Sequence, residues 1–192
     1  MITIKDSWGN TLYSVRSATL PDDLSLEGVD LSGKRLGGAS LANANLRLAN
    51  LRLANLDCAD FDSAILEDAN LETASCEGAD FSDANLQRVK AKGADFYQAV
   101  FFRANLSHAD LEGADLLGVD LKGANLEGAN LTNANLGEGK MGGKTKLHNA
   151  ILTDAVVEGT NFRNALYNER TIFPNGFDPG SHKMILDSDL PP

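Results

Sequence analysis

The chain has 192 residues, a formal net charge of −10 and a sequence pI of about 4.7, so it is a small acidic protein. This charge argues against direct binding of nucleic acid, which needs lysine and arginine clustered on one face, and against anionic membrane surfaces. The sequence also lacks the run of about 18 apolar residues that a membrane-spanning helix needs.

The first 23 residues predict an N-terminal cap. Residues 2–5 and 11–15 are short strand-like runs on either side of the turn-rich segment 6–10, a pattern that suits a β-hairpin. Trp8 lies in that segment, and we interpret it as a residue that packs within the cap. The very short apolar start before Lys5 predicts no signal peptide.

Residues 24–167 follow a repeat of five. From Leu26 to Met141 an apolar residue recurs at every fifth position, almost always with alanine two residues before it, as in Ala44-Asn-Leu46. A period of five fits neither an α-helix nor a single flat strand. Residues two apart in extended backbone share a face, so the alanine and the larger residue should both point inward. Four such units could close a coil of twenty residues, with each coil about 4.8 Å above the last.

These consecutive units, such as Ala49-Asn-Leu51 and Ala59-Asp-Phe61, resemble the pentapeptide-repeat family, whose motif is Ala-(Asp/Asn)-Leu-x-x. The resemblance covers roughly residues 24–167. It implies an all-β fold, namely a right-handed quadrilateral parallel β-helix with short N- and C-terminal caps. Six to seven coils would give a rod on the order of 30 Å long.

Residues twenty apart should then stack in columns. One inner column places Cys76 in the core, whereas Cys58 faces outward one coil earlier, so the two cysteines should not form a disulfide. Reduced cysteines indicate a cytoplasmic protein. A second inner column should hold Leu41, Phe61, Phe81, Phe101, Leu121 and Met141.

The period breaks once, after Met141, where residues 142–147 carry one extra residue before the pattern resumes at Leu147. We expect this segment to bulge from a corner of the rod. It does not match a phosphate-binding loop, because Glu138 stands where that motif requires glycine. Residues 168–192 leave the pattern and predict a C-terminal cap and tail.

The sequence gives no indication of catalysis. The three histidines are scattered, without partner residues at metal-ligand spacing, and the repeat itself supplies most of the aspartates. A filled rod offers no concave site that excludes water. We therefore predict a non-enzyme with no catalytic residue, no metal site and no cofactor.

Function is expected on the outer faces. Two of them alternate in charge, with Arg47 over Glu67 and Asp68 over Arg88, and should be self-satisfied. An acidic corner without a basic residue should gather Asp57, Asp60, Asp62, Glu77, Asp80 and Asp83, and Asp95, Asp110, Asp115 and Asp120 extend it. Beside it stand four outward apolar residues, Tyr97, Val100, Phe102 and Leu117, and on the opposite side Leu48, Leu53 and Ile65.

An exposed apolar group bordered by charge is typical of a protein interface, although these residues could instead pack beneath the 142–147 segment or the tail. The leading hypothesis is a rigid, non-enzymatic scaffold that binds an unknown protein partner, and the acidic charge favours a partner with a basic surface. We expect a monomer, with an end-to-end dimer as the alternative. The family resemblance implies another function, mimicry of DNA towards a type II topoisomerase such as gyrase, as in its quinolone-resistance branch. A third class, an enzyme or a ligand-binding protein that uses residues 137–147 as a lid, has the least support.

Overall fold

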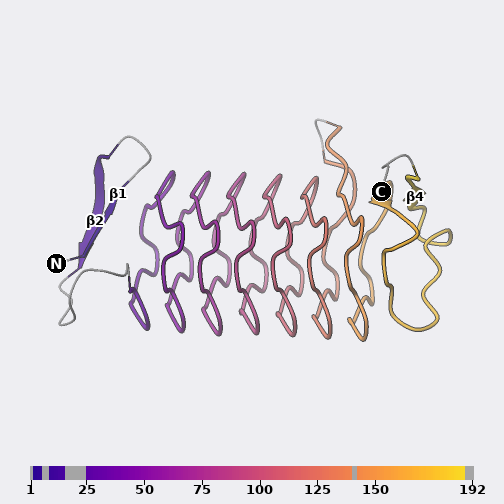
Figure 1. Cartoon of the computed structure of the whole chain (residues 1–192), viewed down its shortest axis with the longest axis horizontal. Coiled ribbons are helices and arrows are strands. Elements are labelled where there is room, and N and C mark those ends of the chain that lie inside the picture. Colours follow the sequence, from indigo (N-terminus) through magenta and orange to yellow (C-terminus); the bar gives the residue numbers. More distant parts are fainter. Residues whose placement is uncertain (1, 6–8, 16–24, 140–141, 189–192) are drawn as a thin grey trace.

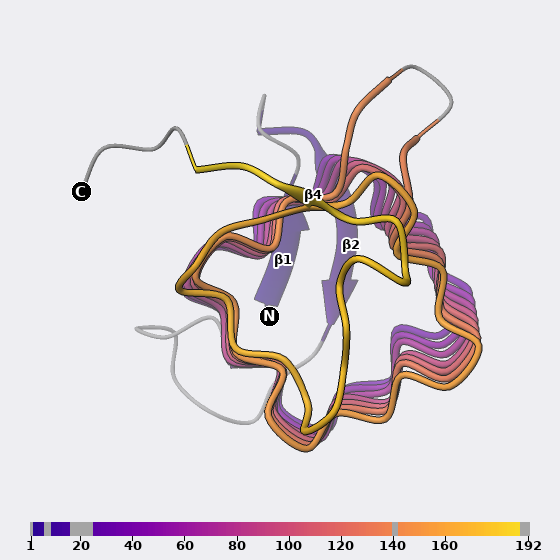
Figure 2. The same cartoon turned by 90° about the vertical axis from the view of Figure 1, so that its right-hand side faces the viewer.

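The computed structural model describes residues 2–5, 9–15, 25–139 and 142–188. The chain forms a right-handed quadrilateral β-helix, in which coils stack into a rod (Figure 1) and trace a four-sided path when viewed along its axis (Figure 2). The all-β fold predicted from the repeat is confirmed. None of the described segments forms a helix that could span a lipid bilayer.

Parallel backbone hydrogen bonds join each coil to the next. The Leu46 N–H donates to the carbonyl of Ile65 at 2.7 Å, and the Ile65 N–H donates to the carbonyl of Ala44 at 2.9 Å. The same ladder recurs on every side, so one coil takes twenty residues. Its four sides in the second coil are marked by the pairs Asn45–Ile65, Asn50–Asn70, Asn55–Ser75 and Asp60–Asp80.

A tight turn separates each side from the next. The Ala49 N–H donates to the carbonyl of Leu46 at 3.0 Å, and Leu48, the third residue of this turn, has a φ of 58°. This left-handed conformation favours glycine and asparagine and disfavours larger side chains. In many units a polar residue before the large apolar one secures the turn that follows, as where Asp80 Oδ1 accepts from the Ser82 N–H at 2.9 Å.

The core is a solid stack of side chains. Phe81 stacks on Phe61 and on Phe101, with ring centroids 4.8 and 4.9 Å apart and planes within 5° of parallel. Phe96, from the neighbouring column, meets Phe81 and Phe101 edge-on. The predicted phenylalanine column is therefore present, and it fills the rod rather than forming a ligand pocket.

The core absorbs two departures from the repeat. Ala91 stands where the column otherwise holds leucine, and Val89, two residues earlier, replaces the usual alanine, so the small and large residues have exchanged places while both stay buried. Cys76 is completely buried, and burial raises the pKa of its thiol well above the usual range. Cys58 is exposed, and both cysteines are free, as the sequence predicts.

The break in the repeat is longer than the sequence suggests. Asp120 pairs with Lys146, 26 positions later instead of 20, so six residues are inserted rather than one. Five of the six added residues make up one whole repeat unit, so the period of five resumes with an apparent shift of only one residue. Leu147 consequently lies over Leu121, in the place predicted for Met141, which itself falls outside the described residues.

The inserted residues leave the coil and return to it as a loop. Glu138 pairs antiparallel with Lys144, and the Gly139 N–H donates to the carbonyl of Gly143 at 2.7 Å. The described parts of this loop extend beyond the outline of the coils (Figure 2). Thr145 anchors its base, because its buried hydroxyl lies 3.0 Å from the carbonyl oxygens of Leu116 and Gly137. We call the loop of residues 138–144, which contains the six added residues, the insertion.

A hairpin lies at the N-terminal end of the rod (Figure 1), where β1 (Ile2–Lys5) pairs antiparallel with β2 (Thr11–Val15). The carbonyl of Lys5 accepts from the Ser40 N–H at 2.7 Å, and Ile4 is buried in the core, so the hairpin covers part of the first coil. Trp8 and residues 16–24 fall outside the described residues.

At the other end, β3 (Leu166–Tyr167) pairs in parallel with β4 (Ile185–Leu186). The segment between them folds over the last coil, where the rings of Phe173, Phe177 and His182 form a cluster that reaches Phe162. Ile172 instead continues the backbone ladder opposite Ile151, and its side chain is 49% exposed.

Replacement of Phe81 by alanine should lower the free energy of unfolding by about 3–5 kcal/mol, because a cavity would open between two stacked rings that the rigid coils cannot close. Phe81→Leu should cost clearly less, since leucine fills the same column at positions 41 and 121. Urea unfolding followed by circular dichroism measures both. A cost below about 1 kcal/mol for Phe81→Ala would show that the core is not tightly packed.

Candidate interaction surface

One side of the rod gathers the predicted acidic residues. Residues 57–62, 77–83 and 97–103 stack in three successive coils, since Asp60 pairs with Asp80 and Asp80 with Val100. We call the surface formed by these three segments the acidic side. It brings together most of the residues that the sequence singles out, in the order predicted.

Hydrogen bonds hold several of these carboxylates in place. Asp60 Oδ1 accepts from the Asp62 N–H at 3.0 Å, and Asp80 Oδ1 accepts from the Ser82 hydroxyl at 2.6 Å. Asp57 accepts from the Ser75 hydroxyl at 2.5 Å and from the Asn55 amide at 2.6 Å. These partners are neutral, so the bonds fix the negative charges without cancelling them.

One carboxylate of the group is neutralised. Arg103 Nη2 lies 2.5 Å from Asp83 Oδ2, and its hydrogen bond with this carboxylate raises the pKa of the Arg103 guanidinium. The prediction of a corner without a basic residue is therefore wrong at Asp83. Arg103 lies twenty positions later in the same column, so reading that column to its next member would have found it. Within the described residues no ion pair involves the other five acids, Asp57, Asp60, Asp62, Glu77 and Asp80.

Phe102 is the most open of the four apolar residues predicted beside the acids, with 40% of its surface exposed. The guanidinium carbon of Arg103 lies 4.8 Å from the centre of its ring, a cation–π contact. Asp83, Arg103 and Phe102 thus form one connected row that holds the aromatic ring in a fixed position. Val100 is half-buried in the ladder between Asp80 and Asp120.

Tyr97 and Leu117 are less available. Both are half-buried, and they stack in one column next to the insertion. A Cβ added to Gly139 would lie 3.1 Å from Cε2 of Tyr97, so the insertion packs directly against this ring. For Tyr97, packing beneath the insertion is therefore the correct alternative, although the contact is at Gly139 and not within residues 142–147. Phe102 is the apolar residue of the acidic side that stays open.

The charges on other sides of the rod are paired between coils. Arg47 lies 3.0 Å from Glu67, and Arg88 lies 2.9 Å from Asp68 and also contacts Glu67. The hydrogen bond with Arg88 holds the pKa of Asp68 below its ordinary value. These ladders are self-satisfied, as predicted, which distinguishes them from the acidic side.

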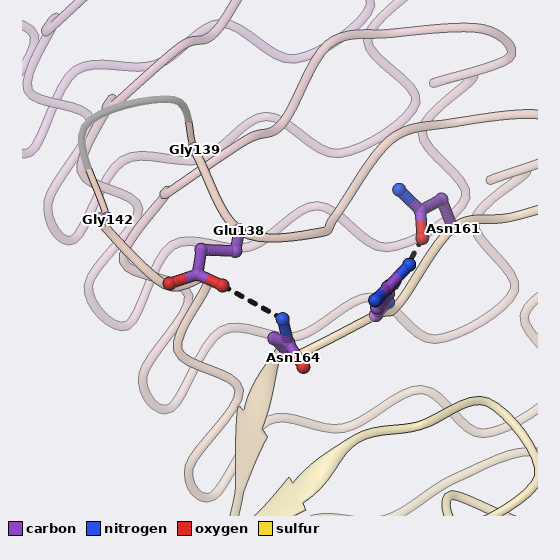
Figure 3. Close-up of a pocket in the computed structure, with 6 residues that line it drawn as sticks. Glu138, Gly139, Gly142, Asn161 and Asn164 are labelled. Atoms are coloured by element: carbon purple, nitrogen blue, oxygen red, sulfur yellow. Dashed lines mark hydrogen bonds between the residues drawn. The ribbon is translucent and has the colours of Figure 1, made fainter.

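A polar depression of about 380 Å³ lies between the insertion and the last full coil (Figure 3). Its polar groups are bonded to one another: Glu138 Oε2 accepts from Asn164 Nδ2 at 2.8 Å, and Asn161 Oδ1 accepts from the Arg163 N–H at 3.1 Å. The sequence did not predict this depression. Among the residues that the structure describes, no three His, Cys, Asp or Glu side chains are placed to hold a metal ion.

Comparison with known proteins agrees with this geometry. No curated protein sequence matches the chain. The solved structure of HetL, a pentapeptide repeat protein involved in heterocyst differentiation regulation in the cyanobacterium Nostoc sp. PCC 7120, is 31% identical over 77% of this chain, with a TM-score of 0.75. The chain spans 62% of the length of HetL. QnrB1, a plasmid-mediated fluoroquinolone resistance protein, shares the fold at 19% identity, with a TM-score of 0.55 over 86% of this chain and 78% of its own.

The profile of the family described as pentapeptide repeats matches residues 35–72, 64–101 and 99–137, with eight copies. These ranges cover more than half of the chain and coincide with the regular coils of the rod. The protein therefore belongs to the pentapeptide-repeat family.

Proposed function

We propose that this protein is a non-enzymatic scaffold that binds another protein through its acidic side, with Phe102 as the central contact. The observation that carries the proposal is the 40% exposure of Phe102 next to five carboxylates that have no ion-pair partner among the described residues. The similarity to HetL, which is involved in the regulation of heterocyst differentiation, supports a regulatory interaction.

The two parts of this surface suit different steps of binding. Fixed carboxylates of one sign attract a basic surface and raise the rate of association. An exposed aromatic ring provides contact energy once the partner has arrived, since aromatic residues dominate the energetics of many interfaces. Because Asp83 and Arg103 already hold the ring, little side-chain entropy is lost on binding.

Replacement of Phe102 by serine should reduce capture of the partner from native lysate about tenfold or more, with the captured protein identified by mass spectrometry. Asp62→Asn should weaken capture mainly at low salt, where charge attraction is least screened. Val156→Ser is the matched control, because Val156 is an exposed apolar residue in the last full coil, away from the acidic side. Circular dichroism verifies that each variant is folded. Unchanged capture by Phe102→Ser would exclude this surface.

The alternative function is DNA mimicry towards a type II topoisomerase, as in the quinolone-resistance branch. The shared fold with QnrB1 and the row of carboxylates along one side favour it. The C-terminal segment argues against it. The family resemblance implies that the quinolone-resistance branch dimerises through an apolar C-terminal helix, whereas the described C-terminal residues here form β4 and turns.

A supercoiling assay with purified gyrase decides between the two functions. The scaffold proposal predicts no inhibition of supercoiling and no protection of gyrase from a quinolone. Inhibition that is lost when Asp62 and Asp80 are both replaced by asparagine would instead support DNA mimicry. Asn at position 80 keeps the side-chain oxygen that the turn needs, as Asn85 and Asn105 do in their own turns.

A further inference from the structure

Two exposed leucines occupy conformations that disfavour them. Leu48 and Leu53 are the third residues of two successive turns, with φ of 58° and 60°, and 55% and 56% of their surfaces are exposed. Most equivalent turn positions hold glycine or a polar residue such as Asn43. Leucine is thus unfavourable here both for the backbone and for solvation, and such an outlier points to a function.

The neighbouring coil offers a recess beside each leucine. Gly28 and Gly33 occupy the same two columns one coil nearer the N-terminus, as the hydrogen bonds of their N–H groups to Arg47 and Arg52 show. Among the described residues, a Cβ added to either glycine would meet nothing within 4 Å. Each exposed leucine side chain therefore lies next to a recess at a glycine, and both leucines lie on the same side of the rod.

Charge on this side alternates in the same way. Glu27 in the first coil and Arg47 in the second are both exposed and lie in one column. Arg47 contacts Glu67, and 45% of its side chain still faces solvent, so some of its N–H donors remain accessible. Asp30 and Asn50 lie between the two turns and join the coils through a hydrogen bond of 3.0 Å.

We propose that a second copy of the chain docks antiparallel on this side, about a two-fold axis that passes between the first and second coils. Such an axis sets the second coil of one copy against the first coil of the other. Leu48 then enters the recess at the partner's Gly28, and Arg47 faces the partner's Glu27. Leu53 likewise enters the recess at the partner's Gly33.

A parallel pairing lacks this match. A two-fold axis along the rod would set each coil against the same coil of the other copy, so Leu48 would face the partner's second coil and not Gly28 of its first coil. The antiparallel arrangement satisfies shape and charge together and repeats every contact twice, as an isologous interface does. It uses the side that carries Asn50, opposite the side of Asp60, so both copies leave their acidic sides free for a partner. This inference does not rest on the proposed function.

Sedimentation equilibrium of the full chain, from about 1 µM to about 1 mM, tests the proposal. The unmodified chain should show a monomer–dimer equilibrium, and the double variant Leu48→Asn, Leu53→Asn should raise its Kd at least about tenfold. The variant should melt no lower than the unmodified chain, because asparagine already occupies this conformation at positions 43 and 133. His108→Asn is the control, since His108 lies in the column of Leu48 three coils further on and should leave the Kd unchanged.

Charge exchange tests the antiparallel arrangement itself. Glu27→Arg and Arg47→Glu should each weaken the dimer, and the two substitutions together should restore it, because the charges would again be opposite across the interface. A monomer at every concentration, a dimer that the leucine variant leaves intact, or charge variants without mutual rescue would each overturn the proposal. None of these outcomes affects capture of a partner through Phe102.

Discussion

The parallel hydrogen bonds between coils govern the whole structure. Each side can pair with the next only if the coils follow the same path, so every regular coil takes twenty residues, and the six extra residues before Lys146 must leave that path as a loop. That requirement places a small and a large apolar residue inward at fixed positions and a left-handed residue in nearly every turn. The exchange of Val89 and Ala91 shows how a departure is tolerated when the volume inside the coil is conserved.

Because the interior is filled, only the outer columns are left to vary freely. Where their charges alternate, as at Arg47 and Glu67, neighbouring coils neutralise each other. On the acidic side carboxylates recur in successive coils, with Asp83 neutralised by Arg103 of the next coil, and an aromatic ring follows them. A rod with such unequal sides can present different surfaces to different partners while remaining rigid. The acidic side and the side of Leu48 lie opposite each other and could be occupied at the same time.

Much of this could be predicted from the sequence, because the repeat converts chain position directly into position in space. The stack at Phe81, the buried Cys76 and the paired ladders follow from counting in twenties. The length of the insertion could not be predicted, since a period of five conceals whole added units. The contact of Gly139 with Tyr97 was hidden for the same reason, because the loop breaks the counting that places every other residue. The left-handed backbone conformation of Leu48 and Leu53 was not predicted, because apolar periodicity identifies outward residues but says nothing about their torsion angles.

The central claim, that Phe102 on the acidic side contacts another protein, is tested most directly by photo-cross-linking. A photo-reactive phenylalanine analogue at position 102, expressed in the native cell and irradiated, should give one discrete adduct whose added mass differs from that of a second copy of the chain. The same analogue at position 108, which is exposed on a different side, should give no such adduct. No adduct from position 102, or the same adduct from both positions, would contradict the account.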